Sequence, residues 1–150
     1  MESECLKCQK FKVTVYTKSP NVKIEIPKCR FEHIHMDIVG PLPVSRGYKY
    51  LLTIIDRTTR WPEVYPLRNI SSETIVKSFI ENYIPRFGIP LKITVDRGAQ
   101  FTSCLFSDLS KILGIQKIHT SAYHPQSNGM IERFHRQLKT SITPSNDPLH

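Results

Sequence analysis

Long apolar runs, cysteines and acidic residues are all scarce in this chain of 150 residues. No stretch approaches the roughly 18 to 20 consecutive apolar residues of a membrane-spanning helix, and the N-terminus lacks the apolar segment of a secretory signal. We therefore expect a soluble, intracellular protein with no membrane partner. The 13 acidic residues face 21 lysines and arginines, which gives a net charge of +8. Such an excess favours an anionic partner, most simply nucleic acid.

The four cysteines do not supply a complete zinc site. Cys5 and Cys8 form the only Cys-x-x-Cys pair, and no histidine or cysteine precedes Cys5. Tetrahedral zinc needs four ligands, so we interpret this pair as free thiols and do not expect bound Zn²⁺. Cys29 and Cys104 are predicted to be small packing residues.

The length of the chain suits one domain, because a chain of this size buries roughly 68 to 70% of the surface that its unfolded form exposes. Residues 1–30 are predicted to be a basic arm, since lysines are scattered through them and Pro20 and Pro27 interrupt any regular run. Residues 31–142 form the predicted core domain, and residues 143–150 an irregular tail.

The first half of the core has the pattern of three strands. Over residues 33–38 apolar and polar residues alternate, which is typical of a strand with two different faces. Residues 48–55 form a nearly continuous β-branched and aromatic run that suits a buried central strand. Residues 61–67 suit a third strand, which Pro62 and Pro66 place at an edge. The short connections predict an antiparallel meander.

The second half alternates helices with strands. A helix capped within residues 71–72 has a regular apolar stripe, and Pro85 is expected to kink or end it. A strand follows over residues 91–95, and a strand reached through a helix lies parallel to an earlier one with a right-handed crossover. A second helix, capped within residues 102–103, leads to a fifth strand over residues 115–119.

The last helix follows a polar loop over residues 120–128 that lacks periodicity. We expect the helix to be capped within residues 127–128. One face of the helix is apolar and another is charged, and the charged face carries Glu132, Arg136 and Lys139.

Three carboxylates occupy the ends of these elements. Asp37 ends the first strand, Asp96 ends the fourth, and Glu132 lies near the start of the last helix, with 35 residues between Asp96 and Glu132. Because the crossover sets the two strands side by side, we expect Asp37 and Asp96 to be neighbours. The alternatives are a structural hydrogen-bond acceptor for Asp37 and, for Glu132, a surface ion pair with Arg136 that contributes about 0.3 to 0.5 kcal/mol.

Three carboxylates gathered at one place repel one another and favour a bound cation. Oxygen ligands suit Mg²⁺ or Mn²⁺, and two such ions can activate a nucleophile and stabilise the leaving oxygen at a phosphodiester. Arg133, Arg136 and Lys139 would then supply contacts to phosphates that do not depend on base sequence. His33 and His35 share the face of Asp37, and we interpret them as neutral surface or packing residues rather than metal ligands.

Together these motifs closely resemble the catalytic core of integrases from gypsy-type LTR retrotransposons and retroviruses. The resemblance covers about residues 31–141, and it is carried by Asp37, by the Asp-Arg-Gly-Ala-Gln-Phe segment of residues 96–101, and by residues 124–133. It implies an α/β, ribonuclease-H-like fold, with a five-stranded mixed sheet, in which an antiparallel meander is joined by parallel strands, flanked by helices. It also implies that Asp37, Asp96 and Glu132 are a catalytic triad that binds Mg²⁺ or Mn²⁺.

The resemblance further implies an activity and its partners. Integrases of this family trim the 3′ ends of element DNA and transfer those ends into target DNA, so we expect DNA as the partner, a homo-oligomer in the full-length family, and a nuclear location. In the family, the loop before the glutamate and the exposed side of its helix contact element DNA. Here, together with the basic Arg133, those positions are Tyr123, Gln126, Arg136 and Lys139.

Both ends of the chain depart from the family pattern. Cys5 and Cys8 resemble the second half of the family's His-His-Cys-Cys zinc domain, but its histidine half is missing here. Residues 143–150 replace the further helices that help form a dimer, which leaves oligomerisation open. A truncated or decayed element copy, or a host gene derived from one, fits this pattern. The alternatives to an integrase are a non-catalytic DNA-binding or scaffolding remnant, and a ribonuclease H or transposase-type nuclease.

Overall fold

The computed structural model describes residues 28–120 and 125–142, and only the backbone of residues 125–128 and 130. The arm up to residue 27 with Cys5 and Cys8, the side chains of Tyr123 and Gln126, and the tail from residue 143 lie outside the described residues. In chain order the elements are β1 (His33–Val39), β2 (Tyr50–Asp56), β3 (Pro62–Leu67), α2 (Ser72–Ser78), η1 (Phe79–Tyr83), α3 (Ile84–Phe87), β4 (Lys92–Val95), α4 (Ala99–Thr102), α5 (Cys104–Ile112), β5 (Gln116–His119) and α6 (Pro125–Ile142).

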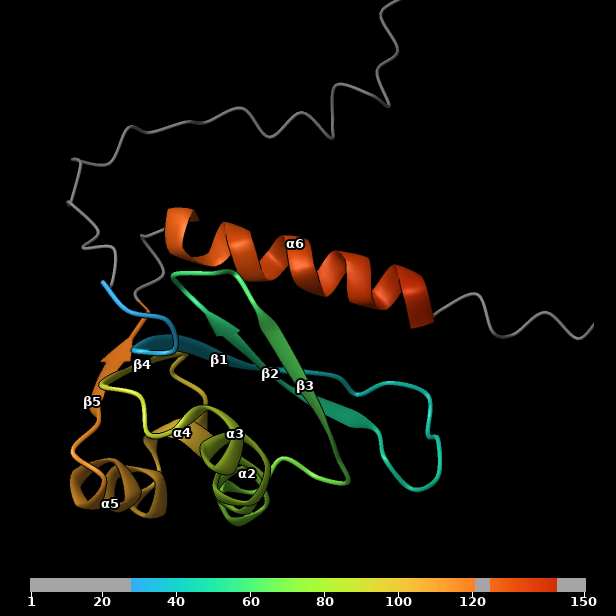
Figure 1. The fold of residues 1–150 in the computed structure, drawn as a ribbon. Helices are drawn as coiled ribbons and strands as arrows, with labels where there is room; N and C mark the ends of the chain where they lie inside the picture. The colour runs from blue at the N-terminus through green and yellow to red at the C-terminus, as the bar shows by residue number, and fades with distance from the viewer. Residues whose placement is uncertain (1–27, 121–124, 143–150) are drawn as a thin grey trace, which may run out of the picture.

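The strands form one five-stranded mixed sheet in the order β3-β2-β1-β4-β5. The first three strands are an antiparallel meander, whereas β4 pairs parallel with both β1 and β5. Figure 1 shows α2 to α5 on one side of the sheet and α6 across the other side. The predicted α/β fold, with a meander joined by parallel strands and flanked by helices, is confirmed.

One face of the sheet carries the hydrophobic core. Alternate residues of a strand point to opposite faces, so Ile34 and Met36 of β1 share a face, and both are fully buried. The helices on that side complete the core with Ile75, Phe79 and Phe106, also fully buried. Burying each such side chain contributes roughly 1.5 to 3 kcal/mol, and this face therefore supplies most of the apolar stabilisation.

The helix after the meander begins and ends at the residues that its sequence favours, and it continues past Pro85. The Ser71 side chain accepts a hydrogen bond from the backbone N–H of Thr74 and so caps α2. The chain then passes through the π-helical η1 into α3, where Pro85 lies in the first turn. A proline there loses no intrahelical hydrogen bond, and the helix ends instead at Gly88, whose φ of 84° suits glycine.

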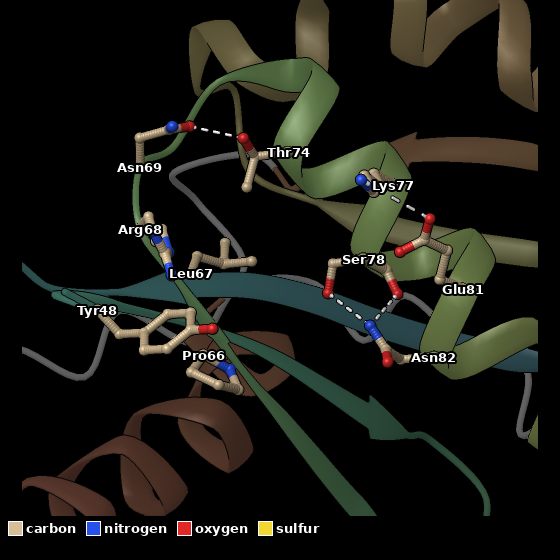
Figure 2. Close-up of a pocket in the computed structure, with 10 residues that line it drawn as sticks. All are labelled: Tyr48, Pro66, Leu67, Arg68, Asn69, Thr74, Lys77, Ser78, Glu81 and Asn82. Carbon is tan, nitrogen blue, oxygen red and sulfur yellow. Dashed lines mark hydrogen bonds and ion pairs between the residues drawn. The ribbon is translucent and has the colours of Figure 1, made fainter. Parts of the chain in front are cut away.

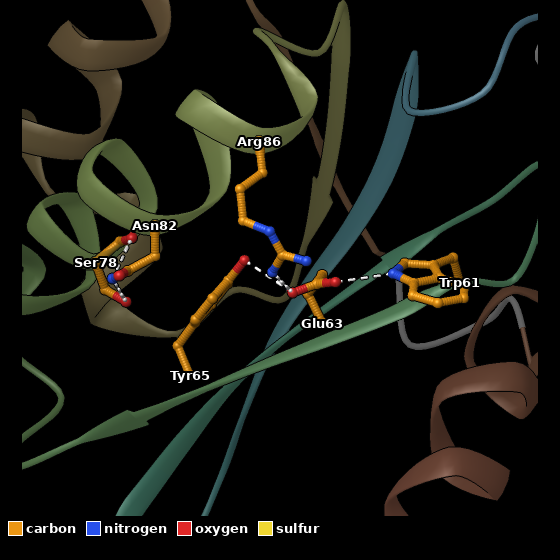
Figure 3. A network of polar contacts seen from close by, with 6 residues as sticks. All are labelled: Trp61, Glu63, Tyr65, Ser78, Asn82 and Arg86. Atoms are coloured by element: carbon orange, nitrogen blue, oxygen red, sulfur yellow. Dashed lines mark hydrogen bonds and ion pairs between the residues drawn. The ribbon is translucent and has the colours of Figure 1, made fainter.

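The edge strand β3 is joined to α3 through the half-buried carboxylate of Glu63, shown in Figure 3. Glu63, with a side chain only 11% exposed, accepts hydrogen bonds from the Trp61 indole at 2.8 Å and the Tyr65 hydroxyl at 3.1 Å, and it pairs with Arg86. Both oxygens of Glu63 are therefore satisfied. The edge position predicted from the strand's prolines is also confirmed.

Two local predictions are wrong. Cys29 and Cys104 are exposed rather than packed, because Cys29 lies in a surface turn and Cys104 points outward from the first turn of α5. The helix α6 begins at Pro125, before the expected cap, since proline is well suited to the first position of a helix. The short α4 was not anticipated. Nowhere in residues 28–120 and 125–142 is a helix long and apolar enough to cross a membrane.

Candidate metal centre

Asp37 and Asp96 belong to neighbouring parts of two adjacent parallel strands. Asp37 lies within β1, two residues before its last residue Val39, so the prediction that Asp37 ends its strand is wrong, whereas Asp96 directly follows β4 as expected. The ladder between β1 and β4 pairs His35 with Thr94, and each aspartate lies two residues further along the chain. Residues two apart in a strand share a face, so both carboxylates belong to the face of the sheet opposite the hydrophobic core. The expected proximity of the two aspartates is confirmed, and the negative charge of Asp96 raises the pKa of Asp37.

The Asp37 carboxylate is held in a setting that disfavours its ionised form. Its Oδ1 accepts a hydrogen bond from the backbone N–H of Ile38 at 2.7 Å, and its side chain is 27% exposed. Burial, and secondly the charge of Asp96, raise the pKa of Asp37 to about 6, although the Ile38 N–H opposes this shift. A cation at this carboxylate would relieve both causes.

The Asp96 carboxylate is oriented by the turn that follows β4. Its Oδ1 accepts a hydrogen bond from the backbone N–H of Gly98 at 2.8 Å, which fixes the side chain against its own loop. A Cβ atom on Gly98 would lie 2.9 Å from the same Oδ1 and 2.4 Å from the amide nitrogen of Gln100. The absence of a side chain at residue 98 therefore keeps this carboxylate in place.

The histidines beside these carboxylates are buried and neutral. His33 is 7% exposed, and its Nε2 lies 2.7 Å from the Thr94 hydroxyl. Burial lowers the pKa of His33 to about 4 and that of His35 to about 3. The Nδ1 atom of His35 has no hydrogen-bond partner among the described residues. Both side chains are buried, as expected of packing residues.

The helix α6 covers this polar face. Its Ile131 is 3% exposed, whereas Glu132, Arg133, Arg136 and Lys139 are exposed. In the described part of the chain, no three His, Cys, Asp or Glu side chains lie together as an ion-binding group, so Glu132 does not complete a cluster with Asp37 and Asp96.

Sequence reasoning missed one residue of this region, His135. Its Nε2 lies 2.9 Å from the hydroxyl of Thr53, and its Nδ1 lies 3.8 Å from Oδ2 of Asp37. Burial, and secondly the charge of Lys139, lower the pKa of His135. Since positions three apart on a helix are neighbours, its place three residues after Glu132 was a signal that could have identified it.

A cleft of about 360 Å³ lies elsewhere, between the end of β3 and the helix formed by α2 and η1. Figure 2 shows Tyr48, Arg68, Lys77 and Asn82 among the residues that line it. None of the candidate carboxylates lines this cleft, so it is separate from the site at Asp37 and Asp96.

The residues present fit a hard divalent cation. Asp37 and Asp96 are oxygen donors on neighbouring strands of the sheet, and burial together with the charge of Asp96 raises the pKa of Asp37. Oxygen donors of this kind suit Mg²⁺ or Mn²⁺, with coordination positions left for water and substrate phosphate. The fold and this pair of aspartates together define a ribonuclease-H-like domain with a candidate metal centre.

Comparison with known proteins agrees with this class. Residues 27–125 match the family described as Integrase core domain. The chain is 38% identical over 112 residues to the Gag-Pol polyprotein of Avian reticuloendotheliosis virus, an alignment that covers 74% of the chain and 10% of the polyprotein. It is 34% identical over 140 residues to the Pro-Pol polyprotein of Simian foamy virus type 3 (strain LK3), covering 93% and 12% respectively. The Pol polyprotein of Radiation murine leukemia virus (strain Kaplan) is 37% identical over 112 residues, covering 74% and 19%.

The chain therefore belongs to the Integrase core domain family, and it is homologous to part of retroviral Pol polyproteins. Its alignments span between 10% and 19% of the length of these three relatives.

Proposed function

We propose that this chain is the catalytic core of a retroelement integrase, a polynucleotidyl transferase that trims 3′ DNA ends and joins them to target DNA. The observation that carries the proposal is the proximity of Asp37, near the end of β1, to Asp96, directly after the adjacent strand β4, within a chain of the Integrase core domain family. The gypsy-type origin and the nuclear location belong to this proposal, and they rest on the sequence motifs alone.

Each candidate residue has a distinct part in the proposed reaction. Asp37 and Asp96 would hold Mg²⁺ or Mn²⁺, and Glu132 would have to join them from α6, since it does not cluster with them among the described residues. The ions would activate the attacking water or hydroxyl and stabilise the leaving oxygen. Arg133, Arg136 and Lys139 are exposed on α6, where they can contact DNA phosphates without reading base sequence. No protein side chain needs to become a covalent nucleophile.

A joining assay tests the proposal. The 150-residue chain, supplied with Mn²⁺ and branched DNA that mimics an integration product, is expected to resolve the branch, and Asp96→Asn is expected to abolish this activity. Asp108→Asn is the matched control, because Asp108 is exposed on α5 and pairs with Lys111 at 3.7 Å. Equal activity in the parent and Asp96→Asn would contradict the proposal.

A non-catalytic DNA-binding remnant is the second candidate, because Glu132 stands apart from the two aspartates. It predicts DNA affinity that falls steeply with salt concentration, no joining activity in the parent, and the same binding by Asp96→Asn. Cleavage of the RNA strand of an RNA:DNA hybrid would instead identify a ribonuclease H.

A further inference from the structure

His135 connects α6 to the two central strands beneath it. Its ring nitrogens make two different contacts, with Nε2 2.9 Å from Oγ1 of Thr53 on β2 and Nδ1 3.8 Å from Oδ2 of Asp37 on β1. Thr53 and Asp37 are themselves partners in the antiparallel ladder. One imidazole therefore spans a buried hydroxyl and a candidate metal-binding carboxylate.

The hydrogen bonds of Thr53 indicate which nitrogen of the His135 ring carries the proton. Thr53 has a single hydroxyl proton, which it donates to the backbone carbonyl of Asp37 at 3.1 Å. The same oxygen must then accept a hydrogen bond from His135, so Nε2 carries the ring proton. In a neutral imidazole the other nitrogen is then an acceptor, which leaves the lone pair of Nδ1 on the side of Asp37.

Two electron-pair donors thus face each other without a hydrogen bond between them. The 3.8 Å between Nδ1 and Oδ2 is too long for a hydrogen bond. Two ligands that each lie about 2.1 Å from one ion are separated by at most about 4.2 Å, so both atoms can reach a single cation. The remaining oxygen of Asp37, Oδ1, is already engaged by the N–H of Ile38.

We propose that Nδ1 of His135 is a ligand of the divalent cation that Asp37 binds, which makes this centre a mixed nitrogen and oxygen site. The geometry that supports this is the pair of His135 and Asp37; among the described residues, Asp96 does not lie with them as an ion-binding group of three. The proposal rests on the metal-dependent function proposed above and deepens it. An imidazole ligand favours Mn²⁺ and other transition metals over Mg²⁺, which prefers oxygen ligands alone. Because Glu132 lies three residues earlier on α6, coordination by His135 also fixes the helical turn that carries this glutamate.

Pulsed electron paramagnetic resonance of the Mn²⁺-loaded chain tests this ligation directly. We expect a nitrogen coupling from a bound imidazole, which changes from the ¹⁴N to the ¹⁵N pattern when only the histidines are ¹⁵N-labelled. This comparison needs no mutation, so it does not depend on a variant that folds. Bound Mn²⁺ without a histidine nitrogen coupling would overturn the ligand assignment and leave the proposed function intact.

Calorimetry with a matched pair of variants identifies the histidine. His135→Gln is expected to weaken Mn²⁺ binding at least about tenfold and to affect Mg²⁺ binding much less. His119→Gln is the control, because His119 is exposed and its Nδ1 lies 3.2 Å from the main-chain oxygen of Asp96 rather than from its carboxylate. Equal Mn²⁺ affinity in both variants would reject His135 as the ligand. A parent chain that binds no Mn²⁺ would refute the metal centre itself, and the ligand assignment with it.

Discussion

The two faces of the central sheet bury very different side chains. Toward α2 to α5, β1 presents Ile34 and Met36, both fully buried within the hydrophobic core. Toward α6, the same strand presents His33, His35 and Asp37. One strand thus carries stability on one side and the candidate chemistry on the other, and the two properties can be changed separately.

Burial of side chains stabilises the fold on the apolar face of the sheet, whereas burial of polar groups on the opposite face costs free energy. His33 is satisfied by Thr94, but Nδ1 of His35 is buried without a hydrogen-bond partner among the described residues, and burying such a group costs about 1 to 3 kcal/mol. The raised pKa of Asp37 adds a further cost at neutral pH. The candidate metal centre therefore lies on the less stable side, where a bound cation would have the most to compensate.

The largest expected effect comes from a cavity on the apolar face. Phe79 is fully buried, and its ring stacks on Tyr83 with 5.3 Å between centroids. Phe79→Ala is expected to lower the free energy of unfolding by about 3 to 5 kcal/mol, measured by urea denaturation. A loss below about 1 kcal/mol would contradict the assignment of the core to this face.

The next effect, of opposite sign, comes from removing charge on the polar face. The pKa of Asp37 rises from 3.8 in the unfolded chain to about 6 in the fold. Between these values the folded chain keeps a proton that the unfolded chain has lost, so this group makes stability fall as pH rises from about 4 to about 6. Asp37→Asn is therefore expected to raise the free energy of unfolding of the metal-free chain by about 1 to 3 kcal/mol at pH 7.

The same substitution is expected to have little effect at pH 4, where the folded Asp37 is protonated. His33 and His35 act in the opposite direction, because their lowered pKa values make stability fall as the solution is acidified below about pH 6.5. Both histidines are present in parent and variant, so the difference between the two denaturation curves isolates Asp37. A variant that is less stable than the parent at pH 7 would show that the carboxylate supports the fold.

The smallest effects distinguish a buried carboxylate from an exposed one. Glu63→Gln is expected to cost about 1 to 2 kcal/mol, because Glu63 is 11% exposed and receives hydrogen bonds on both oxygens. Glu81→Gln is the matched control and is expected to cost below about 0.5 kcal/mol, since Glu81 is 58% exposed and lies 3.9 Å from Lys77. Thermal denaturation measures both, and equal losses would contradict the account of β3 and α3.

The sequence was sufficient for the two-faced strands and their order. Alternation over residues 33–38 and the prolines of β3 report burial and edge position directly, so the meander was predictable. The parallel pairing of β1 and β4 followed from crossover geometry, and it placed Asp37 beside Asp96.

The remaining features depend on contacts distant in sequence. His135 meets Thr53 across 82 positions, and no local pattern encodes that contact. The position of Glu132 depends on how α6 lies on the sheet, and its part in a metal centre stays a prediction. The same holds for the DNA contacts assigned to Arg133, Arg136 and Lys139.

The central claim is that a divalent cation binds on the polar face of the sheet, beside Asp37 and Asp96. The most direct test adds Mn²⁺ below one equivalent to the ¹⁵N-labelled chain and follows amide signals by nuclear magnetic resonance. The account predicts that the signals of Ile38, Arg97 and His135 broaden first, while those of Ser78 and Ser110 beneath the opposite face persist. Broadening centred elsewhere, or none at these three residues, would contradict it.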